Sequence, residues 1–343
     1  MKRPMGLVLA LGLCAALAVV AGCGTATGGA SPSGWESTGA ASAIPDRGGR
    51  VRLFRDTFGD PVPEGIAAGP DGAIWFTDSG NDVIGRITGN GDFTMQTVAG
   101  GEVSNGITAG PDGNLWFTLQ ESPGRIGRIT TAGVVTLFAD RGGSFPQGIT
   151  TGSDGALWFA ESNGRVGRMT TTGRVKYFNV APSDATLKGI VAGPDGALWV
   201  TQNLVNGSRL SNQVIRLTTR GKKTSYTVGA GPDFICVGPD QALWFTEEGS
   251  AAIGRLTIAG AYREFSLDDR YATPSGIATG LDGALWFTNF GSGIGIGRMT
   301  TSGKVKFFNV PGNPETEQIT LGPGGAMWFT STIPPAIGRI TTP

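Results

Sequence analysis

Short apolar runs separated by polar turns recur along most of the chain, from about residue 50 to the end. Each unit has an apolar run around a tryptophan, such as Ala73–Thr77, a second apolar run, such as Ile84–Thr88, and an alternating run, such as Arg174–Phe178. Runs of this length between turn residues indicate short β-strands. Seven tryptophans mark seven copies of a unit of about 42 residues: Trp75, Trp116, Trp158, Trp199, Trp244, Trp286 and Trp328.

A fourth strand precedes the tryptophan run in each unit. In the first unit it carries the pair Gly65-Ile66 and ends at the turn Gly69-Pro70-Asp71-Gly72. Four antiparallel strands per repeat of this length are typical of one blade of a β-propeller. The sequence therefore predicts an all-β fold, a seven-bladed β-propeller with four antiparallel strands per blade.

The ends of the repeat array indicate how the ring closes. The last unit stops after Ile337–Thr342, where its fourth strand is missing. A strand of the missing type lies at the other end, at residues 50–54, in the phrase Gly49-Arg50-Val51-Arg52-Leu53-Phe54. We expect this N-terminal strand to complete the last blade, because pairing would cover two open sheet edges.

Composition agrees with a turn-rich β protein and narrows the chemistry. The 343 residues include 58 glycines and 20 prolines, and only 16% are charged. Lys+Arg and Asp+Glu balance at 27 each, so no basic surface for nucleic acid is expected. The chain contains no histidine, the most common proton shuttle and metal ligand near neutral pH.

The first 48 residues are typical of export rather than of the fold. Residues 1–22 have the basic start and apolar run of a signal peptide, and Val20-Ala21-Gly22-Cys23 is similar to a bacterial lipobox. We expect a lipid on Cys23, a flexible Gly/Ser/Thr-rich tether at 23–48 and the propeller at 49–343. The protein would then be anchored in the membrane, on the outer face of the bacterial cytoplasmic membrane or in the cell envelope. An ordinary secretory signal or an uncleaved anchor is the alternative.

Residues that recur in every unit are expected to serve the architecture. The tryptophans should pack between adjacent blades, Pro-Asp-Gly should form tight turns, and Cys236 should be a small buried apolar residue. One arginine per unit is expected to contact backbone carbonyls or a neighbouring blade: Arg86, Arg128, Arg168, Arg216, Arg255, Arg298 and Arg339. Function is then to be sought where the units differ.

The repeated phrases Gly-Ile-x-x-Gly-Pro-Asp-Gly-Ala-Leu-Trp-Phe-Thr and Ile-Gly-Arg-Ile-Thr-Thr resemble the virginiamycin B lyase family over residues 50–343. The resemblance implies a divalent metal such as Mg²⁺ held by acidic side chains, and a histidine base just before a Gly-Ile pair that opens a cyclic streptogramin B ester by elimination. None of the corresponding positions here is histidine, and we expect them to bind ligand instead: Glu64, Asn105, Gln147, Lys188, Asp233, Ser275 and Glu317.

The resemblance also implies acids at the end of the Trp-Phe-Thr strand. The seven positions there are Asp78, Leu119, Glu161, Gln202, Glu247, Asn289 and Ser331. If the first two strands of a blade pair about a tight turn, each residue lies beside the one 14 positions later. Glu64 should then neighbour Asp78, and Asp233 should neighbour Glu247.

Both sets of residues are expected to meet around one mouth of the central channel. Their six acids against Lys188 predict an acidic funnel, with Glu64, Asp78, Asp233 and Glu247 as candidate ligands for Mg²⁺ or another divalent cation. Alternatively, the acids are solvated or pair with loop amides and arginines. A longer loop in the fourth unit, Asn203 to Gln213, is expected on the same face, either as a ligand-selecting loop or as a tolerated insertion.

Two functional hypotheses remain open. One is a surface-anchored propeller that binds a small molecule, a carbohydrate, a protein or a divalent cation in the funnel. The other is a metal-dependent carbon-oxygen lyase in which Asp233 or Lys188 replaces the histidine, because a carboxylate among carboxylates can act as a base near pH 7. The first is preferred, since losing a general base typically removes about 10²- to 10⁴-fold in rate.

Overall fold

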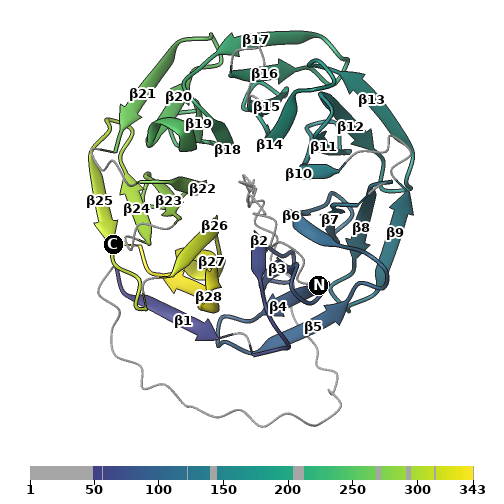
Figure 1. The fold of residues 1–343 in the computed structure, drawn as a ribbon, viewed down its shortest axis with the longest axis vertical. Coiled ribbons are helices and arrows are strands. Elements are labelled where there is room, and N and C mark those ends of the chain that lie inside the picture. The colour runs from purple at the N-terminus through teal and green to yellow at the C-terminus, as the bar shows by residue number, and fades with distance from the viewer. Residues whose placement is uncertain are drawn as a thin grey trace, which may run out of the picture.

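The computed structural model describes residues 49–342 except 56, 122, 140–144, 204–211, 268–271, 291–294 and 313. Seven four-stranded antiparallel sheets are arranged in a ring around a common centre (Figure 1). The first strand of each sheet lies nearest the centre, and the fourth forms the rim. The predicted seven-bladed propeller is therefore confirmed. The predicted signal peptide, tether and lipid on Cys23 lie outside the described residues.

The blades follow the seven sequence units in order. Their strands are β2 (Pro63–Ala68), β3 (Ile74–Asp78), β4 (Val83–Ile87) and β5 (Phe93–Thr97); β6 (Val103–Ala109), β7 (Leu115–Leu119), β8 (Arg125–Ile129) and β9 (Val135–Ala139); β10 (Pro146–Thr151), β11 (Leu157–Glu161), β12 (Arg165–Met169) and β13 (Val175–Asn179); β14 (Thr186–Ala192), β15 (Leu198–Asn203), β16 (Gln213–Leu217) and β17 (Lys223–Thr227); β18 (Pro232–Val237), β19 (Leu243–Glu247), β20 (Ala252–Leu256) and β21 (Tyr262–Ser266); β22 (Pro274–Thr279), β23 (Leu285–Asn289), β24 (Ile296–Met299) and β25 (Val305–Phe308); and β26 (Glu315–Leu321), β27 (Met327–Ile333), β28 (Pro335–Ile340) and β1 (Val51–Arg55). Two short 3₁₀ turns, Glu248–Ser250 and Pro323–Gly325, complete the described elements. No helix among the described residues has the length and apolar character needed to cross a membrane.

The N-terminal strand closes the ring as predicted. Strand β1 pairs antiparallel with β28, with Val51 opposite Ile340 and Phe54 opposite Ile337. The Phe54 ring also stacks on Trp328 at a centroid distance of 5.5 Å. Blade seven is thus built from both ends of the repeat array, and the pairing covers the edge of β28.

The apolar core lies between the blades. Trp116 of blade two belongs to one buried cluster with Ile149 and Leu157 of blade three, and the other described tryptophans are similarly buried. The packing of tryptophans between adjacent blades is therefore confirmed. Cys236 is buried and free, as expected of a small apolar residue.

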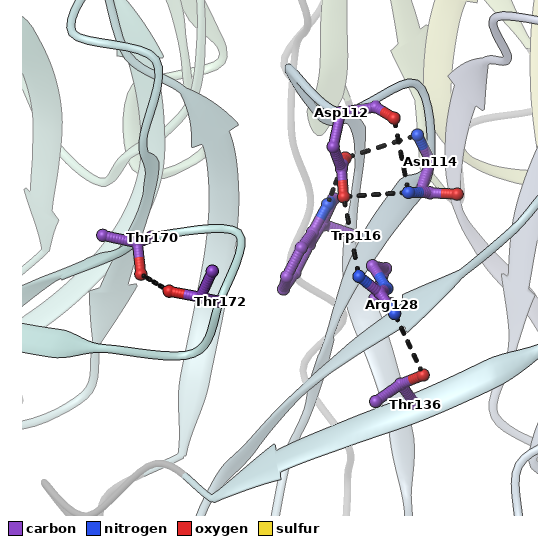
Figure 2. Close-up of polar contacts among 7 residues, drawn as sticks. All are labelled: Asp112, Asn114, Trp116, Arg128, Thr136, Thr170 and Thr172. Carbon is purple, nitrogen blue, oxygen red and sulfur yellow. Dashed lines mark hydrogen bonds and ion pairs between the residues drawn. The ribbon is translucent and has the colours of Figure 1, made fainter.

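Six of the seven recurring arginines bind the aspartate of the turn between the first two strands of their own blade. In blade one, Asp71 accepts a hydrogen bond from Trp75 Nε1 at 3.0 Å on one oxygen and from Arg86 Nε at 2.7 Å on the other. Blade two repeats this arrangement with Asp112, although Arg128 lies farther away, at 3.9 Å (Figure 2). For these six arginines, the expected contact with backbone carbonyls or a neighbouring blade is replaced by an ion pair with the turn carboxylate, which lies within reach of the same-blade guanidinium.

This arrangement, called here the turn clasp, joins a turn aspartate to the tryptophan of the second strand and the arginine of the third. Burial alone would raise the pKa of Asp71, but hydrogen bonds from Trp75 and Arg86 outweigh it and hold the pKa below its usual value. The guanidinium also lies over the indole, 5.9 Å from the ring centroid in blade one. Six blades have the clasp: those of Asp71, Asp112, Asp154, Asp195, Asp240 and Asp282.

A large and a small residue face each other on the second and third strands. In six blades a phenylalanine is opposite a glycine, as with Phe117 and Gly127. A Cβ added at Gly127 would lie 2.1 Å from the Phe117 ring, so this approach requires glycine. Blade four instead pairs Val200 with Ile215, exchanging the large and small positions.

This pairing predicts strong coupling between the two positions. Gly127→Ile alone should lower the free energy of unfolding by about 3 kcal/mol, because the new side chain overpacks against the ring. Adding Phe117→Val, which copies blade four, should recover most of the loss. Urea unfolding of both single variants and the double variant measures the interaction. Additive effects of the two substitutions would contradict this account.

Candidate functional site

The positions before the Gly-Ile pairs, or their equivalents, lie near the beginning of the innermost strands, at the end of the ring called here the channel mouth. Six of these seven side chains are buried and Ser275 is half-buried. In three cases, a threonine of the preceding blade donates a hydrogen bond to the backbone carbonyl of the acidic residue. Thr330 Oγ1 donates to Glu64 O at 2.6 Å, Thr201 Oγ1 to Asp233 O at 2.6 Å and Thr288 Oγ1 to Glu317 O at 2.5 Å. The blade-to-blade contacts therefore fix where these acids stand.

Lys188 and Asp233 form a buried ion pair within this set. Lys188 Nζ lies 3.0 Å from Asp233 Oδ2, and each side chain is 4% exposed. Burial raises the pKa of Asp233 to about 6, even though the charge and hydrogen bond of Lys188 act in the opposite direction. The other oxygen, Oδ1, has no hydrogen-bond partner among the described residues.

Glu64 and Glu317 form no ion pair with any cationic side chain among the described residues. Burial raises the pKa of Glu64 to about 7, with a hydrogen bond from Ser79 opposing the shift and the charge of Asp78 adding to it. Burial also raises the pKa of Glu317 to about 8, and the charges of Glu64 and Asp233 add to the effect. The two side chains are only 6% and 3% exposed. Burial thus favours the protonated form of both carboxyls.

The predicted pairing of the first two strands was wrong by one residue. Pro63, not Glu64, lies opposite Asp78, and Pro232, not Asp233, lies opposite Glu247. A bulge follows each of these prolines, before the regular pairing resumes. The irregularity changes which residues of the inner strand stand beside the acid that ends the second strand.

The acids that end the second strand bind loops of their own blades. Asp78 Oδ1 accepts from Val62 N at 2.7 Å, and Glu247 Oε1 accepts from Gly229 N at 3.0 Å. Glu247 also accepts from Tyr262 Oη on the rim strand β21, and burial raises the pKa of Glu247 to about 7. These two acids therefore bind loop amides, which was the alternative to a role in the acidic funnel.

The rest of this second set also takes part in local contacts. Asn289 Oδ1 accepts from Thr273 N, Ser331 Oγ donates to Pro334 O, and Glu161 forms an ion pair with Arg165 at 2.9 Å. Leu119 and Gln202 are buried. Three members of the second set thus bind the segment before an inner strand, and two bind the beginning of the third strand or the connection to it.

The sequence analysis missed two channel residues, Phe234 and Gln318. They occupy the position that is glycine in the other five blades, and both are fully buried. Gln318 Nε2 donates to Asn105 O at 2.9 Å, so a side chain of blade seven reaches blade two past the inner strand of blade one. The loss of glycine from the Gly-Ile pair was the signal that could have found them.

Carboxylates are suitable donors for Mg²⁺, but their arrangement matters. No group of three or more acids, histidines or cysteines among the described residues is placed to hold a metal ion. Of the four nominated ligands, Glu64 and Asp233 belong to the channel set, whereas Asp78 and Glu247 bind the loops described above. Metal binding stays a prediction. The centre of the blade-four loop, Asn203 to Gln213, lies outside the described residues.

The chain belongs to the virginiamycin B lyase family, whose pattern matches residues 44–206 and 177–343. It is similar to a streptogramin B lyase structure, with 29% identity and a TM-score of 0.77, over 85% of this chain and 97% of that one. It is also similar to a catalytically inactive histidine-to-alanine variant of virginiamycin B lyase from Staphylococcus aureus with quinupristin, with 31% identity and a TM-score of 0.78, over 86% and 99% of the two chains. A hydrazine synthase from Kuenenia stuttgartiensis, at 14% identity and a TM-score of 0.69 over 82% and 96%, shares the fold. No curated protein matches the chain.

The raised pKa of Glu317 predicts how stability depends on pH. Between the usual pKa of 4.5 and the folded value of about 8, the unfolded chain releases a proton that the folded protein keeps. The free energy of unfolding should therefore fall as pH rises through this window, by up to about 1.4 kcal/mol per pH unit from this group. Urea unfolding at about pH 5 to about pH 8 measures the slope.

Glu317→Gln provides the control for this prediction, since it keeps the shape and removes the proton exchange. The variant should have a flatter pH profile and be more stable than the parent at about pH 8. Parallel profiles for the parent and the variant would show that Glu317 does not titrate in this window.

Proposed function

We propose that the protein binds a positively charged ligand at the channel mouth formed by Glu64, Asp233 and Glu317. The observation that carries this proposal is the pair Glu64 and Glu317, two buried carboxyls that interact with each other and have no cationic partner among the described residues. A cation placed between them would relieve both their burial and their mutual repulsion. The charged group can belong to a small molecule, a carbohydrate or a protein, or be a divalent cation.

The predicted export signal and lipid on Cys23 would place this mouth outside the cell, on a tether attached to the membrane. Such an anchor suits a protein that captures a ligand from its surroundings. Neither feature lies within the described residues, so the location is part of the proposal.

Streptogramin lyase activity is the second candidate, and one observation favours it. Asp233 and Glu64, which precede the Gly-Ile pair or its equivalent, have pKa values raised to about 6 and 7, in the range suited to a general base. A Mg²⁺ ion, when bound, would polarise the ester carbonyl. Within this chain, Glu64 or Asp233 would accept the proton. Lys188 is less suited to this role, because it forms an ion pair with Asp233.

The absence of histidine makes this second candidate weaker than the first. The Staphylococcus aureus variant that lacks one histidine is described as catalytically inactive, and this chain has no histidine at all. A carboxylate base would need a new position relative to the substrate, because it is shorter or differently shaped than imidazole. Binding without turnover therefore accounts better for the residues present.

Calorimetric titration tests the binding proposal. Mg²⁺ and 1,4-diaminobutane, as a metal and an organic dication, should be titrated at about pH 6 and about pH 8. At least one should bind, more tightly at the higher pH, because the carboxyls must lose protons to receive a cation. Glu64→Gln and Glu317→Gln should each weaken binding about tenfold or more.

Glu161→Gln is the matched control, since this acid pairs with Arg165 in its own blade. It should leave the affinity unchanged. Absence of binding by both dications, or equal affinity in the Glu64→Gln and Glu317→Gln variants, would exclude the proposed site.

Mass spectrometry separates the lyase from the binding protein. Incubation of the protein with quinupristin and Mg²⁺ should leave the cyclic ester intact. Ring opening that is lost in Asp233→Asn or Glu64→Gln would instead establish a carboxylate base. The Glu161→Gln variant again serves as the control.

A further inference from the structure

Blade seven lacks the acid of the turn clasp. Its turn reads Gly322-Pro323-Gly324-Gly325, so Gly324 stands where the other six blades have aspartate. The two groups that donate hydrogen bonds to this aspartate in other blades are still present in blade seven. Trp328 Nε1 and Arg339 Nε are both buried and have no hydrogen-bond partner among the described residues.

The two donors keep the arrangement of an occupied clasp. The Arg339 guanidinium lies over the Trp328 ring at 5.7 Å, as Arg255 does over Trp244 at 5.7 Å. The Trp328 side chain is 1% exposed. A buried donor without an acceptor is costly, and a cationic one is more so. The blade therefore presents a preformed pair of donors for a carboxylate that its own turn does not supply.

An apolar cavity lies directly beside this turn. It has a volume of about 580 Å³ and lies at the turn end of the inner strands, away from the acidic mouth. Gly322, Gly324 and Gly325 line it together with apolar side chains, among them Val237, Leu281 and Leu321. Leu281, at the rim of the cavity, is 71% exposed and therefore accessible to a ligand from solvent.

Little more than the glycine turn separates the cavity from the donors. A Cβ at Gly322 would lie 2.5 Å from Trp328 Nε1, so the indole edge touches the cavity wall. A Cβ at Gly324 would meet nothing within 4 Å, so there is room for an additional group at this position of the turn. Gly324 and Gly325 have φ angles of 72° and 80°. Two successive glycines give this turn the backbone freedom to move aside.

We infer that blade seven holds a second ligand site, for an apolar molecule that ends in a carboxylate. The apolar part lies in the cavity against Leu281 and Leu321, and the carboxylate takes the place of the missing aspartate between Trp328 Nε1 and Arg339 Nε. Charge and hydrogen bonding then match those of the five blades in which the arginine Nε donates to the turn aspartate. The carboxylate can come from a fatty acid or from the C-terminus of an apolar peptide.

The indole N–H signals of the eight tryptophans provide a direct test by nuclear magnetic resonance. Octanoate and N-acetyl-Leu-Leu, each with its neutral amide as a partner compound, should be titrated into the protein. The Trp328 signal should move on addition of a carboxylate. The matching amide should bind at least about tenfold more weakly, because it loses the charge-assisted hydrogen bonds. The carboxylate that binds more tightly identifies the source.

Substitutions connect the response to the two donors. Gly324→Asp should supply the missing acid and abolish binding, and Arg339→Gln should weaken it about tenfold or more. Leu281→Ser should weaken octanoate binding and leave the response of Trp328 to acetate in place. Asp154→Gly, which removes the acid from a turn outside the cavity, should give no affinity for octanoate at blade three.

Several results would overturn the inference. The first is that neither carboxylate shifts the indole N–H signal of Trp328. The second is that the acid and its amide bind equally well. The third is that Gly324→Asp folds correctly and binds the carboxylate as tightly as the parent. If Gly324→Asp does not fold, unchanged affinity in Arg339→Gln would overturn the inference in the same way. Because the site is remote from Glu64 and Glu317, these results are independent of cation binding at the mouth.

Discussion

The carboxylate of the turn aspartate is the interaction on which six of the seven blades depend. It joins three strands through one side chain, since the turn links the first two strands, the tryptophan lies on the second and the arginine on the third. The aspartate neutralises a partly buried guanidinium and satisfies an indole N–H that would otherwise be buried without an acceptor. Because the tryptophan also packs against the next blade, this polar contact orients the apolar interface of the ring.

The centre of the ring obeys a different constraint. The inner strands converge there, and glycines such as Gly65 let a neighbouring carbonyl approach to a distance that a Cβ would forbid. Threonines then bond from blade to blade, so the backbone of the acidic residues is already held. What remains free to vary is the side chain just before each glycine. This division explains how a repetitive architecture can carry a site that has no symmetry.

The sequence predicted the architecture well, because the features that make blades recur seven times. The count of blades, the closure by residues 50–54 and the tight Pro-Asp-Gly turns all follow from spacing. The site was less accessible. The bulge after Pro63 and Pro232 depends on backbone geometry, and without it Asp78 and Glu247 were assigned to the channel rather than to the loops. Phe234, Gln318 and Gly324 were visible as departures from the repeat, but a departure shows its meaning only when its neighbours in space are known.

The hydrogen bond from Gln318 to Asn105 gives ring closure a second component. Strand β1 joins the first and last parts of the repeat array on the rim, and Gln318 joins blades seven and two near the axis. Both contacts link segments that are far apart in sequence, so neither can form until nearly all of the repeat array is available. Closure is then a late event in folding, and the incomplete ring exposes the interface between its first and last blades.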